Sequence, residues 1–395
     1  MRQVLGVWIA LIVVGCGAAS PSGVTTPSMT ARPTLSVPSA TPAFPTEAFA
    51  AIREDPVSQA LATKFQAAMA RHDVTGGGGM SATVMTPNGT WSGTTGRADD
   101  VRDLQVDDQF AIASIAKSVV AAQVMLMVEA GELGLNDPVA DHLPRDLQFD
   151  TNGATIRELL GHRGGIPDYY DLLAPTQVTE PQRVWTSAEV LALLPPERTP
   201  PGSTFSYTET NYLLLSLVIE HLRGHPLAEV LRDGALAVDG LGRLVYEPDE
   251  RPTEPMAMPA GASHEVLEVR GGYLPSLTTA TAYHTIASDS RSLARWWRAL
   301  CAGDIVSKPS LTEMSAFQPA DLIGGYGLGL YNPANGYATA FGHTGQIPGY
   351  MSWAGCLPDD GAVIVVLTNH EVDDSQHWAF SHGLARPLVD ALHSD

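Results

Sequence analysis

The alternation of apolar and polar residues predicts short β-strands near both ends of the chain. Met80–Thr86 and Trp91–Thr95 have strand composition and flank Asn88-Gly89, a dipeptide that favours a tight hairpin turn. Four more segments toward the C-terminal end are expected to be strands: Tyr326–Tyr331, Ala338–Gly342, Tyr350–Cys356 and Ala362–Thr368.

Helical spacing of apolar residues dominates the segments between these strands. Asp55–Arg71 has an amphipathic pattern with Pro56 in the first turn, where proline is tolerated. Further helices are expected at Ile156–Leu160, Ser187–Leu194, Tyr212–Leu222, Leu227–Arg232, Ser290–Leu300 and Gln376–His393. Two strands, a helical middle, further strands and a last helix predict an α+β fold. Its sheet would be mostly antiparallel, would pair the two ends of the chain and would be flanked by the N- and C-terminal helices.

The first 16 residues have the features of a targeting segment. Arg2 is a minimal basic region, and Val4–Val14 is an apolar stretch too short for a comfortable transmembrane helix. Val13-Val14-Gly15-Cys16 resembles a bacterial lipobox, in which the cysteine is acylated and becomes the mature N-terminus. This predicts an extracytoplasmic protein tethered to a bacterial membrane through Cys16. A plain secretory signal with an incidental cysteine is the alternative.

Composition divides the remaining chain into a linker and a globular domain. Residues 17–50 are rich in Pro, Ser and Thr and predict a flexible linker, whereas residues 51–395 predict one hydrolase domain. Hydrophobic residues make up 44% of the chain, enough for a substantial core. The formal net charge of −20 argues against a nucleic-acid partner and against docking on an anionic surface by charge.

The remaining cysteines and the histidines give no metal pattern. Cys301 and Cys356 form an even pair, which in an exported protein suggests a disulfide, but two separate buried thiols are an equal alternative. His264-Glu265 and His370-Glu371 lack a second ligand at helical spacing. We therefore expect neither a metal nor a cofactor. The oligomeric state stays open.

Lys117 is the most informative residue because its ammonium group stands in an apolar run. It is one of three lysines and lies within Ile112–Ala122, a segment apolar on nearly every side and therefore expected to form a buried helix. A buried ammonium is costly unless it is paired or used. Ser114 lies three residues earlier on the same helical face, where the amine could activate its hydroxyl as a nucleophile. The alternative is an N-cap serine with a lysine that reaches solvent.

Two further segments carry candidate polar residues. Pro201–Leu215 is a turn running into an apolar helix, and Tyr207 precedes that helix with its phenol free to point out. Gly342–Tyr350 follows a strand-like stretch and contains His343, and its glycines would let a ligand approach the backbone. Taken singly, Tyr207 could be a core tyrosine with a bonded hydroxyl, and His343 a satisfied loop histidine.

With these three segments in this order, the chain from Ala51 to His393 resembles the serine β-lactamase and penicillin-binding-protein superfamily. The nearer match is the branch of class C β-lactamases, D,D-carboxypeptidases and related esterases. Three more segments support the resemblance: Gly131–Val139, Leu159–Tyr169 and Ser288–Trp296. The resemblance implies a β-lactamase/transpeptidase-like fold and a serine hydrolase that works through an acyl-enzyme.

The resemblance also implies a role for each catalytic motif residue. Ser114 would form the acyl-enzyme, and Lys117 would help to deprotonate it. Tyr207 would be a partner base that shuttles a proton toward the leaving group. The backbone N–H groups of Ser114 and Gln346 would form the oxyanion hole.

The expected substrate-binding residues include one departure from the family. His343-Thr344-Gly345 matches the Lys-Thr-Gly motif, in which a cation and a hydroxyl would hold a substrate carboxylate. Glu209 stands where family members usually carry Asn. Ionised Glu can only accept hydrogen bonds, and a carboxylate beside Lys117 would favour its charged form, which is a poorer base. If Glu209 points at Lys117, proton abstraction should shift toward Tyr207.

Together the motifs predict a D,D-carboxypeptidase-like hydrolase of D-Ala-D-Ala-type peptides. His343 favours a peptidase or an esterase over a β-lactamase. A carboxylesterase, a class C-like β-lactamase and a wall-peptide-binding lipoprotein that does not turn over are the alternatives. The partner would be a small peptide, ester or β-lactam. The loops Asp168–Thr186 and Arg251–Thr278 would shape the pocket, but they carry no motif that names the substrate.

Overall fold

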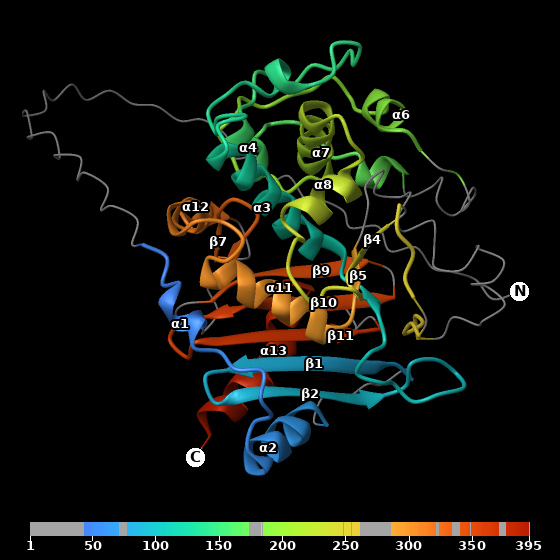
Figure 1. The fold of residues 1–395 in the computed structure, drawn as a ribbon. Helices are drawn as coiled ribbons and strands as arrows, with labels where there is room; N and C mark the ends of the chain where they lie inside the picture. Colours follow the sequence, from blue (N-terminus) through green and yellow to red (C-terminus); the bar gives the residue numbers. More distant parts are fainter. Residues whose placement is uncertain are drawn as a thin grey trace, which may run out of the picture. The chain divides into compact units, whose positions relative to one another are not determined.

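An antiparallel sheet of eight strands forms the centre of the domain in the computed structural model (Figure 1). The structure describes residues 43–70, 77–173, 183, 185–247, 249–253, 255–260, 286–320, 324–333, 340–347, 349–370 and 377–394. The strand order is β2-β1-β11-β10-β9-β8-β7-β6. The strands are β1 (Gly79–Thr86), β2 (Gly89–Gly96), β6 (Gln318–Ala320), β7 (Gly324–Tyr326), β8 (Tyr331–Pro333), β9 (Phe341–Ile347), β10 (Tyr350–Leu357) and β11 (Ala362–Thr368). Because β1 pairs with β11, the sheet joins the two ends of the chain, and the predicted α+β fold is confirmed.

Both faces of the sheet are covered, which explains why its central strands are apolar at nearly every position. All seven residues of β11 are buried. Ile364 and Val366 face the cluster that contains helices α2 (Gln59–Met69) and α13 (His377–His393). Val363 and Val365 face the main core on the opposite side, where α11 (Ser290–Ala302) packs. A strand buried on both faces loses the alternating pattern of a half-exposed strand.

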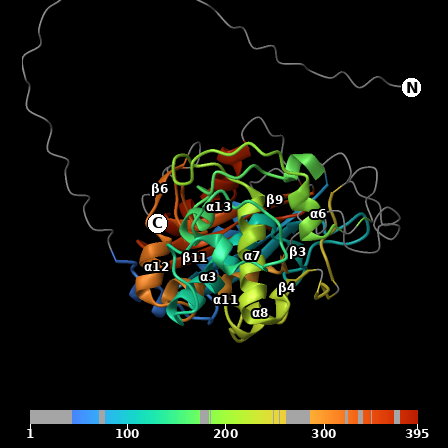
Figure 2. The same ribbon diagram turned by 90° about the horizontal axis from the view of Figure 1, so that it is seen from above.

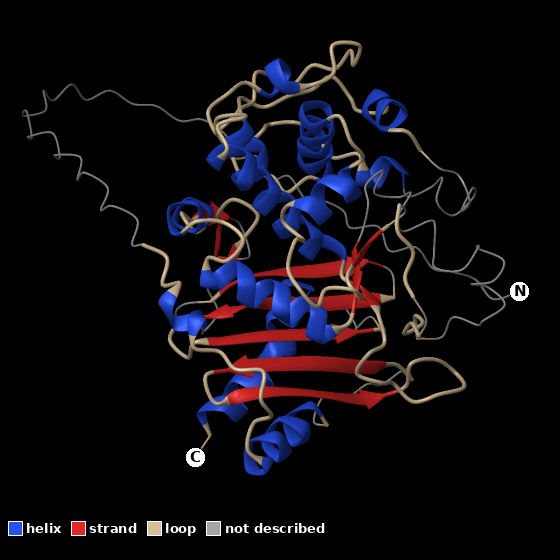
Figure 3. Ribbon diagram, viewed as in Figure 1, coloured by secondary structure: helices blue, strands red, loops and turns tan. Residues whose placement is uncertain are grey.

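A mostly helical region lies beside the β9 side of the sheet (Figures 1 and 3). Viewed from above, α3 and α7 lie over the sheet (Figure 2). The other described elements outside the large sheet are α1 (Glu47–Ala50), η1 (Ala113–Ile115), α3 (Ala116–Glu129), η2 (Val139–His142), α4 (Ile156–Leu160), α6 (Ser187–Ala192), α7 (Glu209–Arg223), α8 (Leu227–Asp233) and α12 (Lys308–Met314), with a small sheet of β3 (Phe110–Ala111), β5 (Ile286–Ser288) and β4 (Val245–Tyr246).

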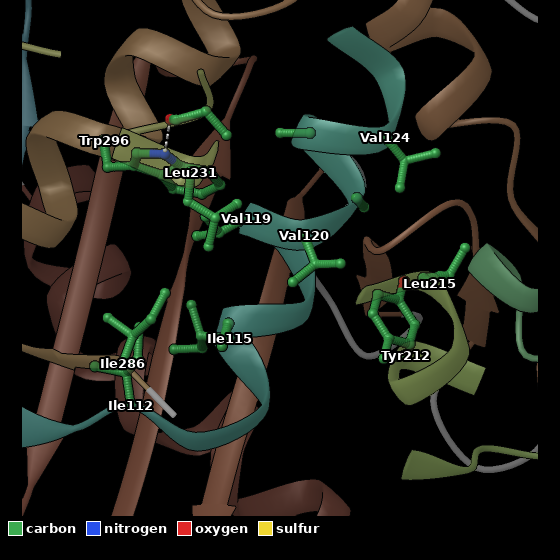
Figure 4. Packing of buried hydrophobic residues seen from close by; sticks show 14 of the residues in the cluster. Ile112, Ile115, Val119, Val120, Val124, Tyr212, Leu215, Leu231, Ile286 and Trp296 are labelled. Atoms are coloured by element: carbon green, nitrogen blue, oxygen red, sulfur yellow. Dashed lines mark hydrogen bonds between the residues drawn. The ribbon is translucent and has the colours of Figure 1, made fainter. Parts of the chain in front are cut away.

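Helix α3 runs through the main core and is apolar on nearly every side. Figure 4 shows Val119 on the side of Leu231 and Trp296, and Val120 on the side of Tyr212 and Leu215. Lys117 is 6% exposed within this helix. The buried helix expected from the run of apolar residues is therefore present, and its first turn carries the lysine into the core.

Some predicted boundaries are wrong, each for a local reason. The rings of Phe44 and Phe49 are buried in the main core, although both residues lie in the region predicted to be a linker up to residue 50. Helix α2 begins only after Ser58, whose hydroxyl accepts a hydrogen bond from Leu61 N–H, so Pro56 lies outside the helix and forms a bridge with Thr90.

The strand expected at Tyr326–Tyr331 is two strands. A turn reverses the chain so that Tyr326 on β7 pairs with Tyr331 on β8. Gly329 adopts φ +73° in that turn, a conformation that favours glycine. The strand expected at Ala338–Gly342 begins, among the described residues, at Phe341 and continues to Ile347, so the glycine-rich segment around His343 is the strand itself.

Candidate active site

Ser114 lies on the 3₁₀ turn η1, between β3 and helix α3, and is partly exposed. The residue before it, Ala113, has φ +50°, which is strained for a residue with a side chain. The turn packs against β9, the strand that carries His343, and against β10. Such strain is common where a fold must present a reactive group. Here it brings the serine to the junction of the sheet and the helical region.

The Lys117 ammonium joins Ser114 to Glu209. Its Nζ lies 3.2 Å from Ser114 Oγ and 2.6 Å from Glu209 Oε2. It also lies 5.0 Å from the centre of the Tyr207 ring and 5.8 Å from that of Tyr212, close enough for cation–π attraction. The lysine is thus compensated by a carboxylate and two aromatic rings instead of by water.

Glu209 points at Lys117, which answers the question that the sequence left open. It is the first residue of α7, and its own backbone N–H donates to Asp168 Oδ1 over 3.0 Å. Lys117 Nζ thus lies between the Glu209 carboxylate and Ser114 Oγ and is within hydrogen-bond distance of both.

Asp168 is a site residue that the sequence did not reveal. One of its oxygens accepts hydrogen bonds from the backbone N–H groups of Tyr170 and Glu209. Burial and the negative charge of Glu209 raise the pKa of Asp168 to about 6. The only sequence signal for Asp168 is its position in Gly165-Ile166-Pro167-Asp168, which lies in the Leu159–Tyr169 segment that supports the family resemblance.

Tyr207 lies immediately before α7 and turns its hydroxyl inward, contrary to the expectation that it points out. The hydroxyl oxygen is buried without a well-aligned hydrogen bond to any described residue. Burial and the charge of Glu209 raise the pKa of Tyr207 well above its ordinary value, while the nearby Ser114 hydroxyl acts in the opposite direction. Burial thus disfavours the phenolate beside the serine, and the role of Tyr207 as partner base and proton shuttle stays a prediction.

His343 is not the expected cation. It is fully buried, and its Nδ1 donates to Thr344 O over 2.6 Å. Its Nε2 lies 3.3 Å from the Tyr326 hydroxyl, which donates to it in that tautomer. Burial, followed by the charge of Lys117 and partly opposed by the bond to Thr344, lowers the pKa of His343 to about 3. A neutral imidazole with both nitrogens engaged cannot provide charge for a substrate carboxylate.

The rest of the His-Thr-Gly segment lies along β9. Thr344 is 8% exposed and Gln346 is exposed, opposite Met351 of β10. A Cβ at Gly345 would collide with the carbonyl oxygen of Ile112, two residues before Ser114. The glycine therefore lets the strand approach the turn that carries the nucleophile. Gln346 follows it on the same strand, as the proposed oxyanion contact requires.

The β-lactamase family profile matches residues 61–384, most of the chain and all of these residues. The chain belongs to the β-lactamase family. This confirms the resemblance read from the motifs, which is to a superfamily of serine hydrolases.

Two curated relatives of this β-lactamase-family protein come from bacteria. Penicillin-binding protein 4* of Bacillus subtilis is 28% identical over 302 residues, which cover 70% of this chain and 64% of the relative. A D-aminopeptidase of Cereibacter sphaeroides is 24% identical over 331 residues, 79% of this chain and 60% of the relative. The hydrolase thus spans less than two thirds of the length of either relative.

A solved structure similar to this hydrolase is the D-amino acid amidase of Ochrobactrum anthropi SV3, in complex with D-phenylalanine. The TM-score is 0.70 and the sequence identity 25%, and the match covers 85% of this chain and 100% of the amidase. Fold and family are therefore shared with enzymes named for action on D-amino acid derivatives.

Outside the active site, the hydrolase contains the disulfide that was one of two alternatives for its C-terminal cysteines. Cys301 at the end of α11 is bonded to Cys356 on β10. The lipidation residue predicted from the sequence, Cys16, lies outside the described residues. Within the described ranges, no helix is long and apolar enough to cross a membrane, and no three His, Cys, Asp or Glu residues form a group that could hold a metal.

Proposed function

We propose that this hydrolase is an amidase or peptidase that cleaves amides or short peptides of D-amino acids through an acyl-enzyme on Ser114. The observation that carries the proposal is the 3.2 Å contact between Lys117 Nζ and Ser114 Oγ in a buried setting, with the Tyr207 hydroxyl alongside. The relatives named as a D-aminopeptidase and a D-amino acid amidase support the same class of bond.

The chemistry follows from the protonation states of the three groups. Lys117 first passes one of its protons to solvent. The neutral amine then accepts the proton on Ser114 Oγ, and Glu209 stabilises the ammonium that re-forms. Oγ then bonds to the substrate carbonyl carbon. The neutral Tyr207 phenol donates its proton to the departing nitrogen and recovers one through Lys117. The C–N bond breaks, an amine leaves, and water hydrolyses the ester on Ser114.

Charge balance favours substrates that carry an ammonium group over substrates that carry a terminal carboxylate. Lys117 is neutralised by Glu209, and His343 is uncharged, so the expected cationic anchor is missing from the described residues of the site. Asp168 adds a second carboxylate beside Glu209. A D,D-carboxypeptidase must bind a C-terminal carboxylate, whereas an α-ammonium would be attracted to these acids. We therefore place D-aminopeptidase or D-amidase activity before the D,D-carboxypeptidase activity predicted from the motifs.

The test compares five substrates on the wild-type chain and on Ser114→Ala. They are D-alanine p-nitroanilide, its N-acetyl derivative, an acyl-D-Ala-D-Ala peptide, p-nitrophenyl acetate and benzylpenicillin. The expected result is the highest kcat/KM on the free-amine anilide, no turnover by Ser114→Ala, and an acyl adduct located on Ser114 by mass spectrometry.

Other patterns of turnover would contradict this order of preference. Hydrolysis of the acyl-D-Ala-D-Ala peptide alone would restore the D,D-carboxypeptidase, and hydrolysis of the ester or the penicillin alone would indicate an esterase or a β-lactamase. A stable adduct without turnover would indicate a binding protein. Glu209→Asn, which restores the usual family residue, should move preference from the free-amine anilide toward the acylated peptide. Because it removes the carboxylate that pairs with the buried Lys117 ammonium, it should also lower the melting temperature.

A further inference from the structure

We propose that His162 is the positioning residue for Tyr207, the proton donor of the proposed reaction, and that it acts only through this tyrosine. The inference rests on the proposed function of the Ser114 site. His162 follows α4 and is fully buried, far from Tyr207 in sequence but in contact with it in the fold. Tyr207 itself lies in a segment without regular secondary structure, so no helix or strand ladder fixes its place.

The backbone on both sides of Tyr207 is bound to His162. Ser206 N–H donates to the carbonyl oxygen of His162 over 2.8 Å. Thr208 N–H donates to the imidazole Nδ1 over 3.2 Å. One residue thus satisfies the N–H donors immediately before and after the tyrosine, which fixes the direction in which its side chain leaves the backbone.

The ring of His162 packs against the ring of Tyr207. Their centres lie 4.1 Å apart with planes inclined by 33°. Tyr326 and Tyr212 surround the imidazole at 4.9 and 5.1 Å. The ring of Tyr207 is therefore held by its packing against the His162 imidazole and by the nearby Lys117 ammonium.

The hydrogen bonds determine the tautomer of His162. A backbone N–H can only donate, so Nδ1 must be the unprotonated acceptor, and it also receives the side-chain amide of Asn211 over 3.3 Å. The proton then resides on Nε2, which is buried without an acceptor among the described residues. Burial and the Lys117 charge lower the pKa of His162 well below its ordinary value. Because the charged form of the ring is disfavoured and Nδ1 is already occupied, the imidazole can hold the tyrosine without competing for its proton.

The backbone of His162 is strained, and such strain is common at residues that have a functional role. Its φ is +54°, a conformation that few residues with side chains adopt and that Asn and His tolerate better than most. Asn is therefore the conservative substitution: it accepts the same backbone geometry and offers an acceptor to Thr208 N–H, but it removes the ring.

The test is a double-mutant cycle of His162→Asn and Tyr207→Phe, measured on the substrate that the wild type turns over fastest. His162→Asn should lower kcat by roughly 10- to 100-fold with KM changed less than about threefold, because misplacement of a proton donor affects the chemical step. The double variant should be no slower than Tyr207→Phe alone. If the fold losses in kcat of the two single variants multiply in the double variant, the proposal is overturned. If the wild type acylates without turnover, the rate of Ser114 acylation by benzylpenicillin replaces kcat.

Two further variants separate positioning from loss of stability. Val218→Ala removes two buried methyl groups at a position of α7 that is distant from Tyr207 along the helix. It should lower the melting temperature and leave kcat unchanged. If His162→Asn does not fold, Asn211→Ala removes the second donor to Nδ1 and should show a smaller loss of kcat that also disappears in the Tyr207→Phe background. If no reagent reacts with Ser114 in the wild type, the proposed function itself is refuted. If the wild type is active and the two substitutions lower kcat independently of each other, only the role of His162 is refuted.

Discussion

At the scale of single residues, the site combines one lysine with two acidic residues, and the lysine is almost fully buried. Lys117 and Glu209 lie 2.6 Å apart, with side chains 7% and 17% exposed. Removing one partner of such a pair leaves an uncompensated buried charge, which is more damaging than the pair is stabilising. The substitutions with the clearest outcome are therefore those that keep the pair and change its neighbours.

Tyr207→Phe is expected to separate activity from stability. The phenol hydroxyl is buried without a well-aligned hydrogen bond to any described residue, so removing it should leave the melting temperature unchanged or raise it slightly. The loss of a positioned proton donor should lower kcat/KM by roughly 10²- to 10⁴-fold. Calorimetry and steady-state kinetics on the same preparation check both halves. A large fall in melting temperature would show that the hydroxyl has a partner that stabilises the fold.

Asp168 is expected to give the enzyme a pH dependence near 6. Its pKa is raised from 3.8 to about 6, so its contribution to stability is fully present below pH 4 and is lost as pH rises through 6. Asp168→Asn should therefore gain stability relative to the wild type between pH 4 and 7, by roughly 1–3 kcal/mol. In the same interval the wild-type kcat/KM for a free-amine anilide should rise as the carboxylate ionises.

The measurements for Asp168 are urea unfolding at pH 4 and pH 7 and a pH profile of kcat/KM. Asp168→Asn should flatten the profile for D-alanine p-nitroanilide and leave the profile for its N-acetyl derivative as in the wild type. An equal effect on both anilides would contradict an attraction between Asp168 and the substrate ammonium.

At the scale of elements, the site depends on close contact between strand β9 and the turn η1. Gly345 makes this contact possible, because any side chain there would collide with Ile112 O. The strand and the turn come from distant parts of the chain, and a shift between them moves the nucleophile relative to Gln346 and Thr344.

Gly345→Ala is expected to lower activity strongly while the fold persists. Displacing the nucleophile by about 1 Å can cost roughly 100-fold in rate, and we expect a loss of this order in kcat/KM. Gly242→Ala is the matched control, since a Cβ there meets no atom within 4 Å and should change nothing. Circular dichroism and the rate of Ser114 labelling by a fluorophosphonate distinguish a displaced site from an unfolded chain. Full activity of Gly345→Ala would show that η1 can shift to accommodate the added Cβ without displacing Ser114 from its reactive position.

The elements that could be predicted are those determined by the residue pattern within one short segment of the sequence. The apolar run Ile112–Ala122 predicted a buried helix and a compensated lysine, because periodicity and the cost of a buried charge are properties of a short segment. The strand expected at Tyr326–Tyr331 was wrong because composition cannot distinguish one strand from two that pair across a tight turn. His162 and Asp168 were missed because their significance lies in contacts with α7 and the segment before it, which only the fold creates.

At the scale of the whole molecule, the disulfide links the helix that covers the sheet to a strand beside the site. Cys301 on α11 and Cys356 on β10 are 55 residues apart in sequence. We expect the Cys301→Ser/Cys356→Ser variant to lose roughly 2–4 kcal/mol of unfolding free energy, because the open chain gains conformational freedom when unfolded. Unfolding in urea with and without reductant checks this. An unchanged midpoint for the reduced wild type would show that packing alone holds α11 on the sheet.

The last prediction concerns where the molecule resides. A net charge of −20 repels the domain from an anionic membrane, so retention at a membrane would require a lipid anchor rather than a charged surface. We propose that acylation of Cys16 provides it, since two acyl chains anchor stably where one is marginal. The full chain expressed in a bacterium should sediment with membranes and resist extraction by high salt, whereas Cys16→Ser should move to the soluble extracytoplasmic fraction with its Ser114 labelling intact. A Cys16→Ser chain that still sediments with membranes would exclude the lipid anchor.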